Sequence, residues 1–362
     1  MAGLRSPRAA LADLTPYRGE MPAGKLILAA NESPFNLPVV LREKLQARSA
    51  DFPFNRYPDP LAQKLRAKLA AAQGVATDCI LLGNGGDELL LDIMLAWGGT
   101  GRTMLQFTPT FSMYEIYAQT LGTEVVSLPR DPDTYGIDIE AATERLQAGD
   151  IDLCFLDNPN NPSGNLTDTA SLLTLIAASD CLFVVDEAYF EFSGQSMRAY
   201  LDQLPNLVIL RTFSKAYSLA GLRLGYVLAS PQVIEQLSRV RMPYSVNAFT
   251  QFVAELVVDM PEEFDRNIAT IIEQRDSLYA QMSAFAGVEV WQSAANFLLF
   301  RLPRAAAVWQ CLLDDYDIYV RNFSQAAGLE NCLRVTVGDA QQNARFMTAL
   351  SAAIARSTDK RD

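Results

Sequence analysis

The chain has 362 residues, 49% of them hydrophobic and 20% charged, with 42 acidic against 30 basic side chains. A net charge of −12 argues against a nucleic-acid or anionic-membrane partner and is adequate for ordinary solubility. The chain contains no histidine, which excludes Ser-His-Asp and Cys-His catalysis, histidine acid-base chemistry and histidine-liganded zinc. Any proton-transfer step must therefore use lysine, tyrosine, cysteine or a carboxylate.

The five cysteines are scattered and form no Cys-x-x-Cys pair, which favours a reduced, cytoplasmic protein. The N-terminus lacks the apolar core of a secretory signal, and no run reaches the ~18 apolar residues that a membrane-spanning helix needs. No cluster of carboxylates indicates a metal site. At 39.9 kDa, two closely packed domains are expected.

The elements predicted along the chain begin with an N-terminal arm over residues 1–30 and a turn at residues 31–34. A proline-flanked loop at 55–60 leads into a helix over 61–73, which Gly74 ends. Further helices are predicted over 87–97 and 110–121. Short apolar runs, typical of buried parallel strands, lie at 80–82, 103–107, 124–128, 153–156, 182–185, 207–210 and 225–229.

Beyond residue 245 the pattern changes to a long helical stretch over 249–285. Four predicted strands and a C-terminal helix follow, the strands at 287–291, 296–301, 318–321 and 333–337. The pattern predicts an α/β fold: a large three-layer α/β domain with a mostly parallel sheet, and a smaller α+β domain. We assign residues 1–48 to the arm and part of the small domain, 49–245 to the large domain and 246–362 to the small C-terminal domain.

One segment that could bind a ligand is Gly83-Asn-Gly-Gly-Asp-Glu88, where a strand meets a helix. Glycine backbone N–H groups at a helix N-terminus can bind a phosphate, although a simple turn explains the same residues equally well. The segment is not a P-loop, because no Lys-Ser/Thr pair follows it, and it lacks the third glycine of the dinucleotide fingerprint.

Two later segments complete the pattern. Asp186 follows a buried strand, at the end where open α/β sheets present ligand groups, although such carboxylates are often only helix caps. Lys215 is the single lysine between residues 68 and 360; it follows two hydroxyl residues and precedes Arg223. A lysine amine forms Schiff bases with carbonyls, and hydroxyls with an arginine can hold a phosphate. Pyridoxal 5′-phosphate explains all three features, with its aldehyde on Lys215 and its pyridine nitrogen on Asp186.

With these segments the sequence resembles the pyridoxal-phosphate-dependent aminotransferases of fold type I, class I/II, and within them the histidinol-phosphate aminotransferases. The resemblance covers nearly the whole chain. In order, it runs through residues 14–17, 31–34, 55–58, 83–88, 109–114, 158–164, 186–189, 211–225, 295–297 and 332–338.

The resemblance implies a role for each matching residue. Lys215 is similar to the lysine that holds the cofactor as an aldimine and moves a proton between the substrate Cα and the cofactor C4′. Asp186 resembles the partner of the pyridine nitrogen, and Asn161 and Tyr189 resemble the pair that hydrogen-bonds the 3′-oxygen. The other implied cofactor contacts are a ring-stacking aromatic, Phe111; a phosphate cup of Gly85, Gly86, Asp87, Thr212, Ser214 and Arg223; and Tyr57, which reaches the phosphate of the neighbouring subunit. The implied substrate contacts are Arg334 for the anionic group, with Arg321, Tyr17 and Asn31 as secondary contacts.

The sequence departs from the family pattern at three positions. Phe111 stands where tyrosine is common, Ser163 where threonine is usual, and Gly86 where serine or alanine is frequent. These changes leave the implied chemistry intact and bear only on the substrate.

The resemblance implies a cytoplasmic homodimer of histidine biosynthesis. By a ping-pong mechanism it would interconvert L-histidinol phosphate plus 2-oxoglutarate and imidazole acetol phosphate plus L-glutamate. Three alternatives stay open: a broader aromatic or aspartate-type aminotransferase, a threonine-phosphate decarboxylase, and a non-catalytic regulatory domain that binds pyridoxal phosphate.

Overall fold

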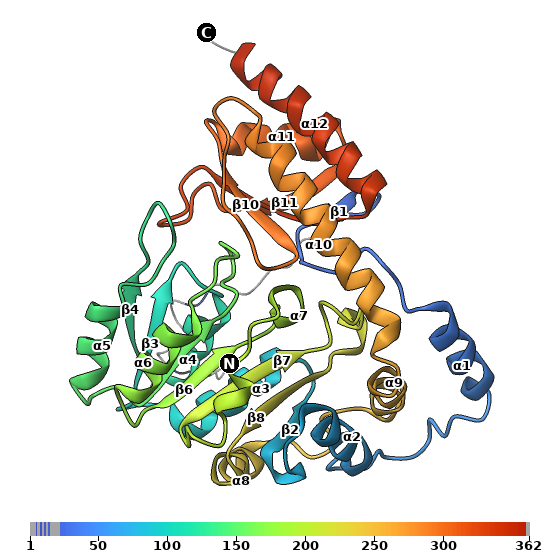
Figure 1. Cartoon of the computed structure of the whole chain (residues 1–362), viewed down its shortest axis with the longest axis vertical. Helices are drawn as coiled ribbons and strands as arrows, with labels where there is room; N and C mark the ends of the chain where they lie inside the picture. The colour runs from blue at the N-terminus through green and yellow to red at the C-terminus, as the bar shows by residue number, and fades with distance from the viewer. Residues whose placement is uncertain (1–4, 6–7, 9–10, 12–13, 15–21, 360–362) are drawn as a thin grey trace.

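The larger part of the molecule is built on a seven-stranded sheet (Figure 1). The computed structural model describes residues 5, 8, 11, 14 and 22–359. The strand order is β2-β8-β7-β6-β5-β3-β4, and all neighbours are parallel except β8, which is antiparallel to both β2 and β7. Its strands are β2 (Ile80–Gly83), β3 (Thr103–Thr108), β4 (Glu124–Pro129), β5 (Leu153–Asp157), β6 (Leu182–Asp186), β7 (Leu207–Thr212) and β8 (Gly225–Ala229).

Helices cover both faces of this sheet, because successive side chains of a strand point to opposite faces. On β5, Leu153 and Phe155 pack with the helices α3, α4 and α8, whereas Cys154 and Leu156 pack with α2, α5, α6 and α9. The result is a three-layer α/β arrangement. These helices are α2 (Gln63–Gln73), α3 (Gly86–Trp97), α4 (Met113–Leu121), α5 (Ile139–Gln147), α6 (Thr169–Ala177), α8 (Pro231–Val240) and α9 (Ala248–Val258).

A second, five-stranded sheet has the order β1-β11-β12-β10-β9. One face packs on the long helix α10 and on α11 and α12, so that the other face is turned toward the larger sheet (Figure 1). The elements are β1 (Leu26–Leu28), β9 (Glu289–Val290), β10 (Phe297–Arg301), β11 (Ile318–Asn322), β12 (Cys332–Thr336), α10 (Glu262–Ser283), α11 (Ala305–Asp315) and α12 (Ala340–Asp359). The remaining elements are α1 (Val39–Ser49), α7 (Phe190–Ser193) and short 3-10 turns at Thr77–Cys79, Met197–Tyr200 and Ala220–Leu222.

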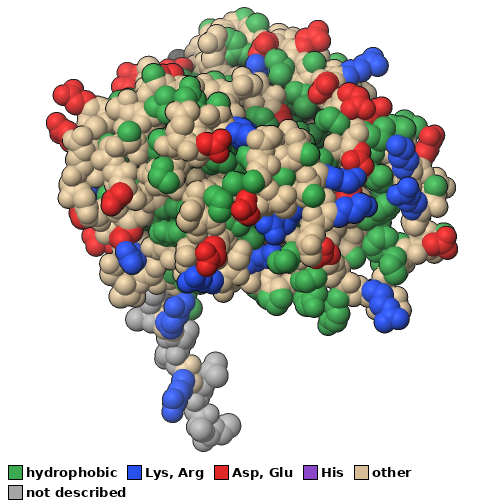
Figure 2. Space-filling model, turned by 60° about the horizontal axis from the view of Figure 1, so that its bottom comes forward, with side chains coloured by type: hydrophobic (Ala, Val, Ile, Leu, Met, Phe, Trp, Pro, Cys, Tyr) green, Lys and Arg blue, Asp and Glu red, His purple; other side chains and the backbone are tan. Residues whose placement is uncertain are grey.

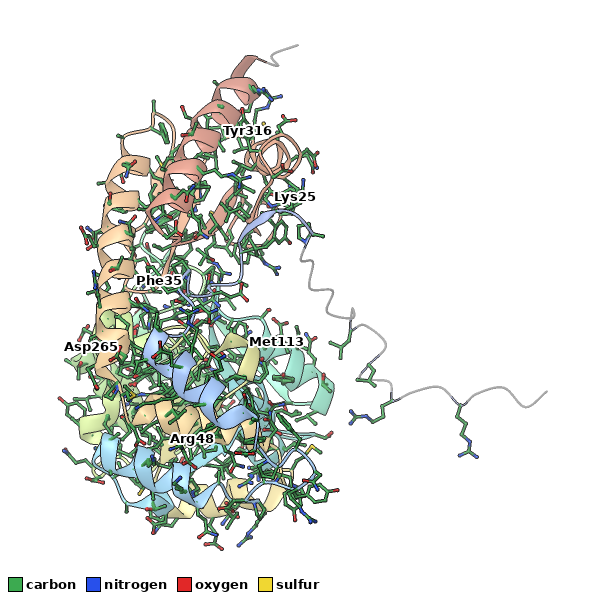
Figure 3. The ribbon with its side chains drawn as sticks, turned by 90° about the vertical axis from the view of Figure 1, so that its right-hand side faces the viewer. Lys25, Phe35, Arg48, Met113, Asp265 and Tyr316 are labelled. Atoms are coloured by element: carbon green, nitrogen blue, oxygen red, sulfur yellow. The ribbon has the colours of Figure 1, made fainter. Side chains whose placement is uncertain are left out.

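The chain passes from the second sheet to the first through residues 29–38. Figure 3 shows this path, from Lys25 beside the smaller sheet, past Phe35, to the helix α1 that carries Arg48. Because the path lies between the two sheets, its backbone is available to side chains from both.

Three expectations about secondary structure were wrong. Residues 26–28, predicted as arm without a strand, form the strand β1, which pairs in parallel with β11. The helical stretch predicted over 249–285 is two helices, because Pro261 cannot continue α9 and instead precedes the first turn of α10. The strand over 225–229 runs antiparallel, and an apolar run on both faces does not reveal strand direction. The domain boundaries at residues 48 and 245 stay predictions.

Within the described residues, no helix is both long enough and apolar enough to cross a membrane.

The core of the larger sheet gives a test of the fold. Phe183 is fully buried on β6, in the middle of the sheet. We expect Phe183→Ala to lower the free energy of unfolding by about 3–5 kcal/mol, because the lost apolar contacts leave a cavity. Urea unfolding measures the change. Leu166→Ala, at a side chain 36% exposed, is the control and should cost less than about 1 kcal/mol; equal losses would contradict this packing.

Candidate functional site

Lys215 lies in the loop that follows β7, at the carboxyl edge of the larger sheet. Its Nζ donates a hydrogen bond to the carbonyl oxygen of Ala30 at 2.9 Å and lies 6.0 Å from the ring centre of Tyr189. Burial, and after it the positive charge of Arg334, lowers the pKa of Lys215 to about 8. Near neutral pH a larger share of this lysine is therefore a neutral, nucleophilic amine than of an ordinary lysine.

Asp186 is the last residue of β6 and is buried. Its Oδ2 accepts a hydrogen bond from the Tyr114 hydroxyl at 2.7 Å, and its Oδ1 accepts one from the backbone N–H of Ala188 at 3.0 Å. Burial raises the pKa of Asp186 to about 7 even though the hydrogen bond from Tyr114 acts in the opposite direction. The carboxylate is thus placed to bind a protonated ring nitrogen.

The predicted phosphate cup forms where α3 begins. Gly85 has a φ of 85°, and a Cβ there would lie 2.5 Å from the Arg223 guanidinium. Arg223 Nη2 donates to Asp87 Oδ2 at 2.9 Å, and Arg223 Nη1 donates to Ser214 Oγ at 3.5 Å. The Thr212 hydroxyl donates to Ser214 Oγ at 3.0 Å. The structure therefore brings the helix N-terminus, two hydroxyls and a guanidinium together.

The pair expected at the cofactor 3′-oxygen lies on the other side of the site. Tyr189 Oη accepts a hydrogen bond from the side-chain amide of Asn31 at 2.9 Å, and Asn161 Oδ1 accepts one from Arg334. Burial raises the pKa of Tyr189 to about 12, so its hydroxyl stays protonated at neutral pH and can donate to a neighbouring oxygen. Asn31 thus acts inside the site by holding Tyr189.

Two arginines of the smaller sheet face the site together. Arg321 on β11 pairs directly with Arg334 on β12, and each guanidinium carbon lies 5.6 Å from the ring centre of Phe323. Arg334 also donates to the Ala29 carbonyl oxygen at 2.8 Å. This arrangement presents two positive charges at one place, which suits an anionic group of a substrate.

The remaining predicted residues behave differently. Phe111, just before α4, is half-buried, with its ring edge-on to Tyr114 at 5.7 Å. Tyr57 is 83% exposed and contacts Tyr244 at a ring distance of 4.9 Å, so the structure does not bring it to the phosphate cup of its own chain. Tyr17 lies outside the described residues.

Sequence reasoning missed residues that hold the site in place. Tyr114 lies three residues after Phe111, a helical spacing that puts both on one face, but no role was assigned to it. Asp157, at the end of β5, was also missed; its Oδ2 accepts the backbone N–H of Asn161 at 2.7 Å. A carboxylate at the end of the strand next to Asp186 was the available signal.

These residues fit pyridoxal phosphate. Gly85 and Gly225 make room for a close approach of backbone and guanidinium, since a Cβ at Gly225 would lie 2.9 Å from the backbone of Gly85 and Gly86. This cofactor requires three kinds of group, and the site has all of them: an amine of lowered pKa, a buried carboxylate and a phosphate cup. Among the described residues, no group of three or more Cys, Asp or Glu is placed to hold a metal ion.

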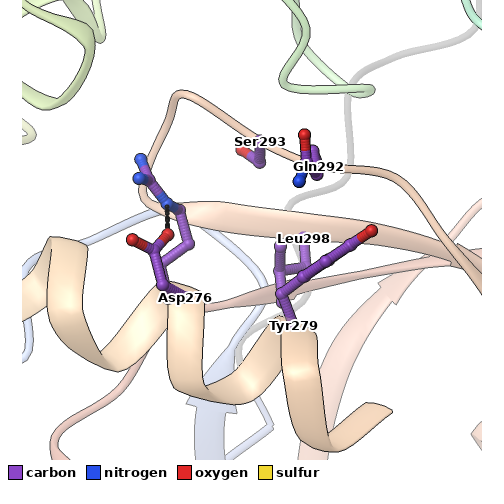
Figure 4. Close-up of a pocket in the computed structure, with 6 residues that line it drawn as sticks. Asp276, Tyr279, Gln292, Ser293 and Leu298 are labelled. Atoms are coloured by element: carbon purple, nitrogen blue, oxygen red, sulfur yellow. Dashed lines mark hydrogen bonds and ion pairs between the residues drawn. The ribbon is translucent and has the colours of Figure 1, made fainter. Parts of the chain in front are cut away.

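A separate pocket of about 300 Å³ lies between α10 and the loop before β10 (Figure 4). Two of its lining residues, Arg275 and Asp276, form an ion pair of 2.9 Å, which Figure 4 marks with a dashed line. None of the predicted site residues lines it, so it plays no part in the chemistry described above. The lining residues are Arg275, Asp276, Tyr279, Gln292, Ser293 and Leu298.

Comparisons with known proteins identify the family of the chain. The model of the class I and II aminotransferase family matches residues 23–350. Histidinol-phosphate aminotransferase 1 of Carboxydothermus hydrogenoformans is 40% identical over 341 residues, which cover 94% of this chain and 96% of that protein. The structure of histidinol-phosphate aminotransferase from Sinorhizobium meliloti, in complex with pyridoxal-5′-phosphate, has a TM-score of 0.84 at 24% identity and covers 91% of each chain. L-threonine-O-3-phosphate decarboxylase from Porphyromonas gingivalis has a TM-score of 0.80 at 28% identity, over 91% of this chain and 99% of that one.

The environment of Lys215 gives a pH prediction. Only the neutral amine attacks an aldehyde. The rate at which Lys215 of the cofactor-free protein reacts with an aldehyde should therefore rise with pH and level off above about 8. An ordinary lysine would continue to gain reactivity to beyond pH 10. Borohydride trapping followed by peptide mass spectrometry measures the rate, with exposed Lys64 in the same chain as the internal control. Arg334→Met should move the midpoint upward; a midpoint near 10 in the unaltered protein would contradict the argument.

Proposed function

The chain belongs to the class I and II aminotransferase family, and we propose that it interconverts L-histidinol phosphate and imidazole acetol phosphate, with 2-oxoglutarate and L-glutamate as the second pair. The observation that carries the choice of substrate is the pairing of Arg321 with Arg334 across two strands beside Phe323. Two guanidinium groups match the two charges of a phosphate better than the single charge of a carboxylate.

The enzymes of this family use pyridoxal phosphate, which supplies an aldehyde and an electron-withdrawing ring that acidify the Cα proton of a bound amino substrate. In this chain Lys215 would hold the aldehyde end and Asp186 the ring nitrogen. The phosphate would lie in the cup of Gly85, Gly86, Asp87, Thr212, Ser214 and Arg223, the ring against Phe111, and the 3′-oxygen against Asn161 and Tyr189.

Lys215 is the group that moves the proton. Its amine lies in the buried site with a lowered pKa, so that it would take the proton from the substrate Cα and hold it for return. Arg334 fixes the anionic end of the substrate, so that Cα lies within reach of the amine. This assignment accounts for acid-base catalysis in a chain without histidine.

The two amino donors would use the same arginine pair in turn. Glutamate places a carboxylate there, and histidinol phosphate places its phosphate there. Since one site serves both donors, the first product must leave before the second substrate binds, which gives ping-pong kinetics.

A phosphothreonine decarboxylase is the second candidate, because the 28% identical solved structure carries that name and such a substrate also has a phosphate. Release of CO₂ from L-threonine phosphate, without dependence on 2-oxoglutarate, would identify it. An aromatic or aspartate-type aminotransferase would instead favour amino acids that lack a phosphate.

The active unit in this proposal is a homodimer. Large apolar side chains stand exposed on two neighbouring loops, before α2 and between α8 and α9: Phe54 is 73%, Tyr57 83% and Met242 66% exposed. Figure 2, which turns the end that carries α2 and α8 toward the viewer, shows hydrophobic side chains gathered on part of that face. Such a surface is typical of a protein interface, and a second copy seated there would bring its Tyr57 toward the phosphate cup.

We also place the protein in the cytoplasm and keep the predicted two-domain division at residues 48 and 245. All five cysteines are free thiols, which fits a reducing compartment. The two sheets with their separate apolar clusters support the division.

The substrate proposal predicts a preference. With 2-oxoglutarate as acceptor, kcat/KM for L-histidinol phosphate should exceed that for phenylalanine, tyrosine and aspartate by about a hundredfold, because the second arginine adds a charged hydrogen bond. Double-reciprocal plots should be parallel, and Lys215→Ala should abolish transamination.

Arg321→Met isolates the phosphate contact. It should lower kcat/KM for histidinol phosphate about tenfold or more and affect glutamate less, whereas Arg42→Met, at an exposed position of α1, should change neither. Equal losses for both substrates would assign Arg321 no part in phosphate recognition.

The dimer proposal predicts complementation between two impaired variants. Lys215→Ala subunits carry an intact Tyr57, and Tyr57→Ala subunits carry an intact lysine. After mixed refolding at limiting cofactor, hybrid dimers should contain one native site each and recover about a quarter of the unaltered activity. An active monomer in gel filtration, or no recovery from a mixture that contains hybrids, would contradict it.

A further inference from the structure

The hydroxyl of Tyr114 is directed at the carboxylate that would bind the ring nitrogen. Tyr114 lies in the first turn of α4 and is fully buried, and its Oη donates to Asp186 Oδ2 at 2.7 Å. Its ring stacks on Phe155 at 4.8 Å with an interplanar angle of 13°, and Phe111 lies edge-on to it. Since aromatic contacts fix the ring, the direction of the hydroxyl is also fixed.

A second buried carboxylate lies beside Asp186, and its effect on the charge of Asp186 is opposite to that of the Tyr114 hydrogen bond. Asp157 and Asp186 are paired residues at the ends of the parallel strands β5 and β6, and both are buried. Buried Arg130 lies 3.3 Å from Asp157 and partly balances its charge. A carboxylate beside another carboxylate in a buried site tends to take up a proton and lose its charge.

The other charged groups near Asp186 oppose its ionisation. Burial and the charges of Asp157 and Asp87 each raise the pKa of Asp186, whereas the hydrogen bonds from Tyr114 and from the Ala188 backbone lower it. Tyr114 thus supplies the one side-chain donor to this carboxylate among the described residues.

We propose that Tyr114 is a positioning residue, whose hydroxyl keeps the Asp186 carboxylate ionised and aimed at the pyridine nitrogen of the cofactor. The proposal rests on the proposed function, because it assumes that Asp186 meets that nitrogen. When Tyr114 donates, the proton shared between ring nitrogen and carboxylate stays on the nitrogen. Without the donor, the carboxylate becomes more basic and the same proton moves to Asp186, which leaves the ring nitrogen neutral.

A merely structural role for the hydroxyl predicts otherwise. A buried hydroxyl needs a hydrogen-bond partner in any case, and its loss then lowers stability without changing the ring nitrogen. The protonation state of that nitrogen therefore separates the two roles.

The test compares Tyr114→Phe with Tyr135→Phe, which removes a second buried tyrosine hydroxyl. The Tyr135 hydroxyl donates to the Gly328 carbonyl oxygen at 3.2 Å. Tyr135 follows the edge strand β4, which β3 and β5 separate from the strand β6 that carries Asp186. Each holoenzyme is prepared with pyridoxal phosphate labelled with ¹⁵N in the ring, and the nitrogen shift is recorded between pH 6 and 8.

We expect the protonated-pyridine shift in the unaltered protein and in Tyr135→Phe, and a shift toward neutral pyridine in Tyr114→Phe. In the same variant kcat should fall about tenfold with KM for glutamate nearly unchanged, because Arg334 is intact. An unchanged nitrogen shift in folded, cofactor-loaded Tyr114→Phe would overturn the proposal.

Tyr114→His covers the case in which the phenylalanine variant does not fold. It restores an N–H donor, and its imidazole signals are unambiguous because the chain has no other histidine. The ring nitrogen should stay mainly protonated, and a neutral one would count against the proposal. If the unaltered protein binds no pyridoxal phosphate, the proposed function itself fails, a result distinct from either variant outcome.

Discussion

The site depends on three consecutive residues that cross between the two sheets. The Ala29 carbonyl oxygen accepts from Arg334, the Ala30 carbonyl oxygen accepts from Lys215, and the Asn31 amide donates to Tyr189. Pairing of β1 with β11 holds this segment to the smaller sheet. This short stretch of chain therefore connects Arg334 of the smaller sheet to Lys215 and Tyr189 of the larger unit. A shift of the smaller sheet against the larger one would change the contacts of Lys215 and Tyr189 together, so the segment couples the sheet that carries Arg334 to the position of the Lys215 amine.

Much of the site was predictable because its residues come in short local motifs. A strand followed by Gly83–Glu88 predicts a helix N-terminus that binds an anion, and the structure begins α3 at Gly86. Thr212, Ser214 and Lys215 lie within four consecutive residues at the end of β7, so their proximity follows from the sequence alone. Asp186 was predictable from its place at a strand end. Each of these inferences needs only local geometry.

The rest depends on contacts between distant residues, which no local pattern specifies. β1 is three residues long and carries no turn signal, and only its pairing with β11, nearly 300 residues later, makes it a strand. Tyr114 reads as one more apolar residue of an amphipathic helix until β6 places Asp186 opposite its hydroxyl. Tyr57 was implied only by family resemblance, and within one chain it contacts Tyr244, because its proposed partner is a second subunit.

Electrostatics links substrate recognition to the chemistry of Lys215. Burial and the charge of Arg334 both lower the pKa of the lysine, which favours the neutral amine that an aldehyde must meet. An anionic substrate seated on Arg334 cancels part of that positive charge, so the amine becomes more basic at the moment when it must take a proton from Cα. In the proposed function the same arginine would therefore serve both stages, first by keeping the amine nucleophilic and then, once neutralised, by letting it act as a base. A chain with no histidine obtains its titratable group near neutral pH from this balance of charges around one lysine.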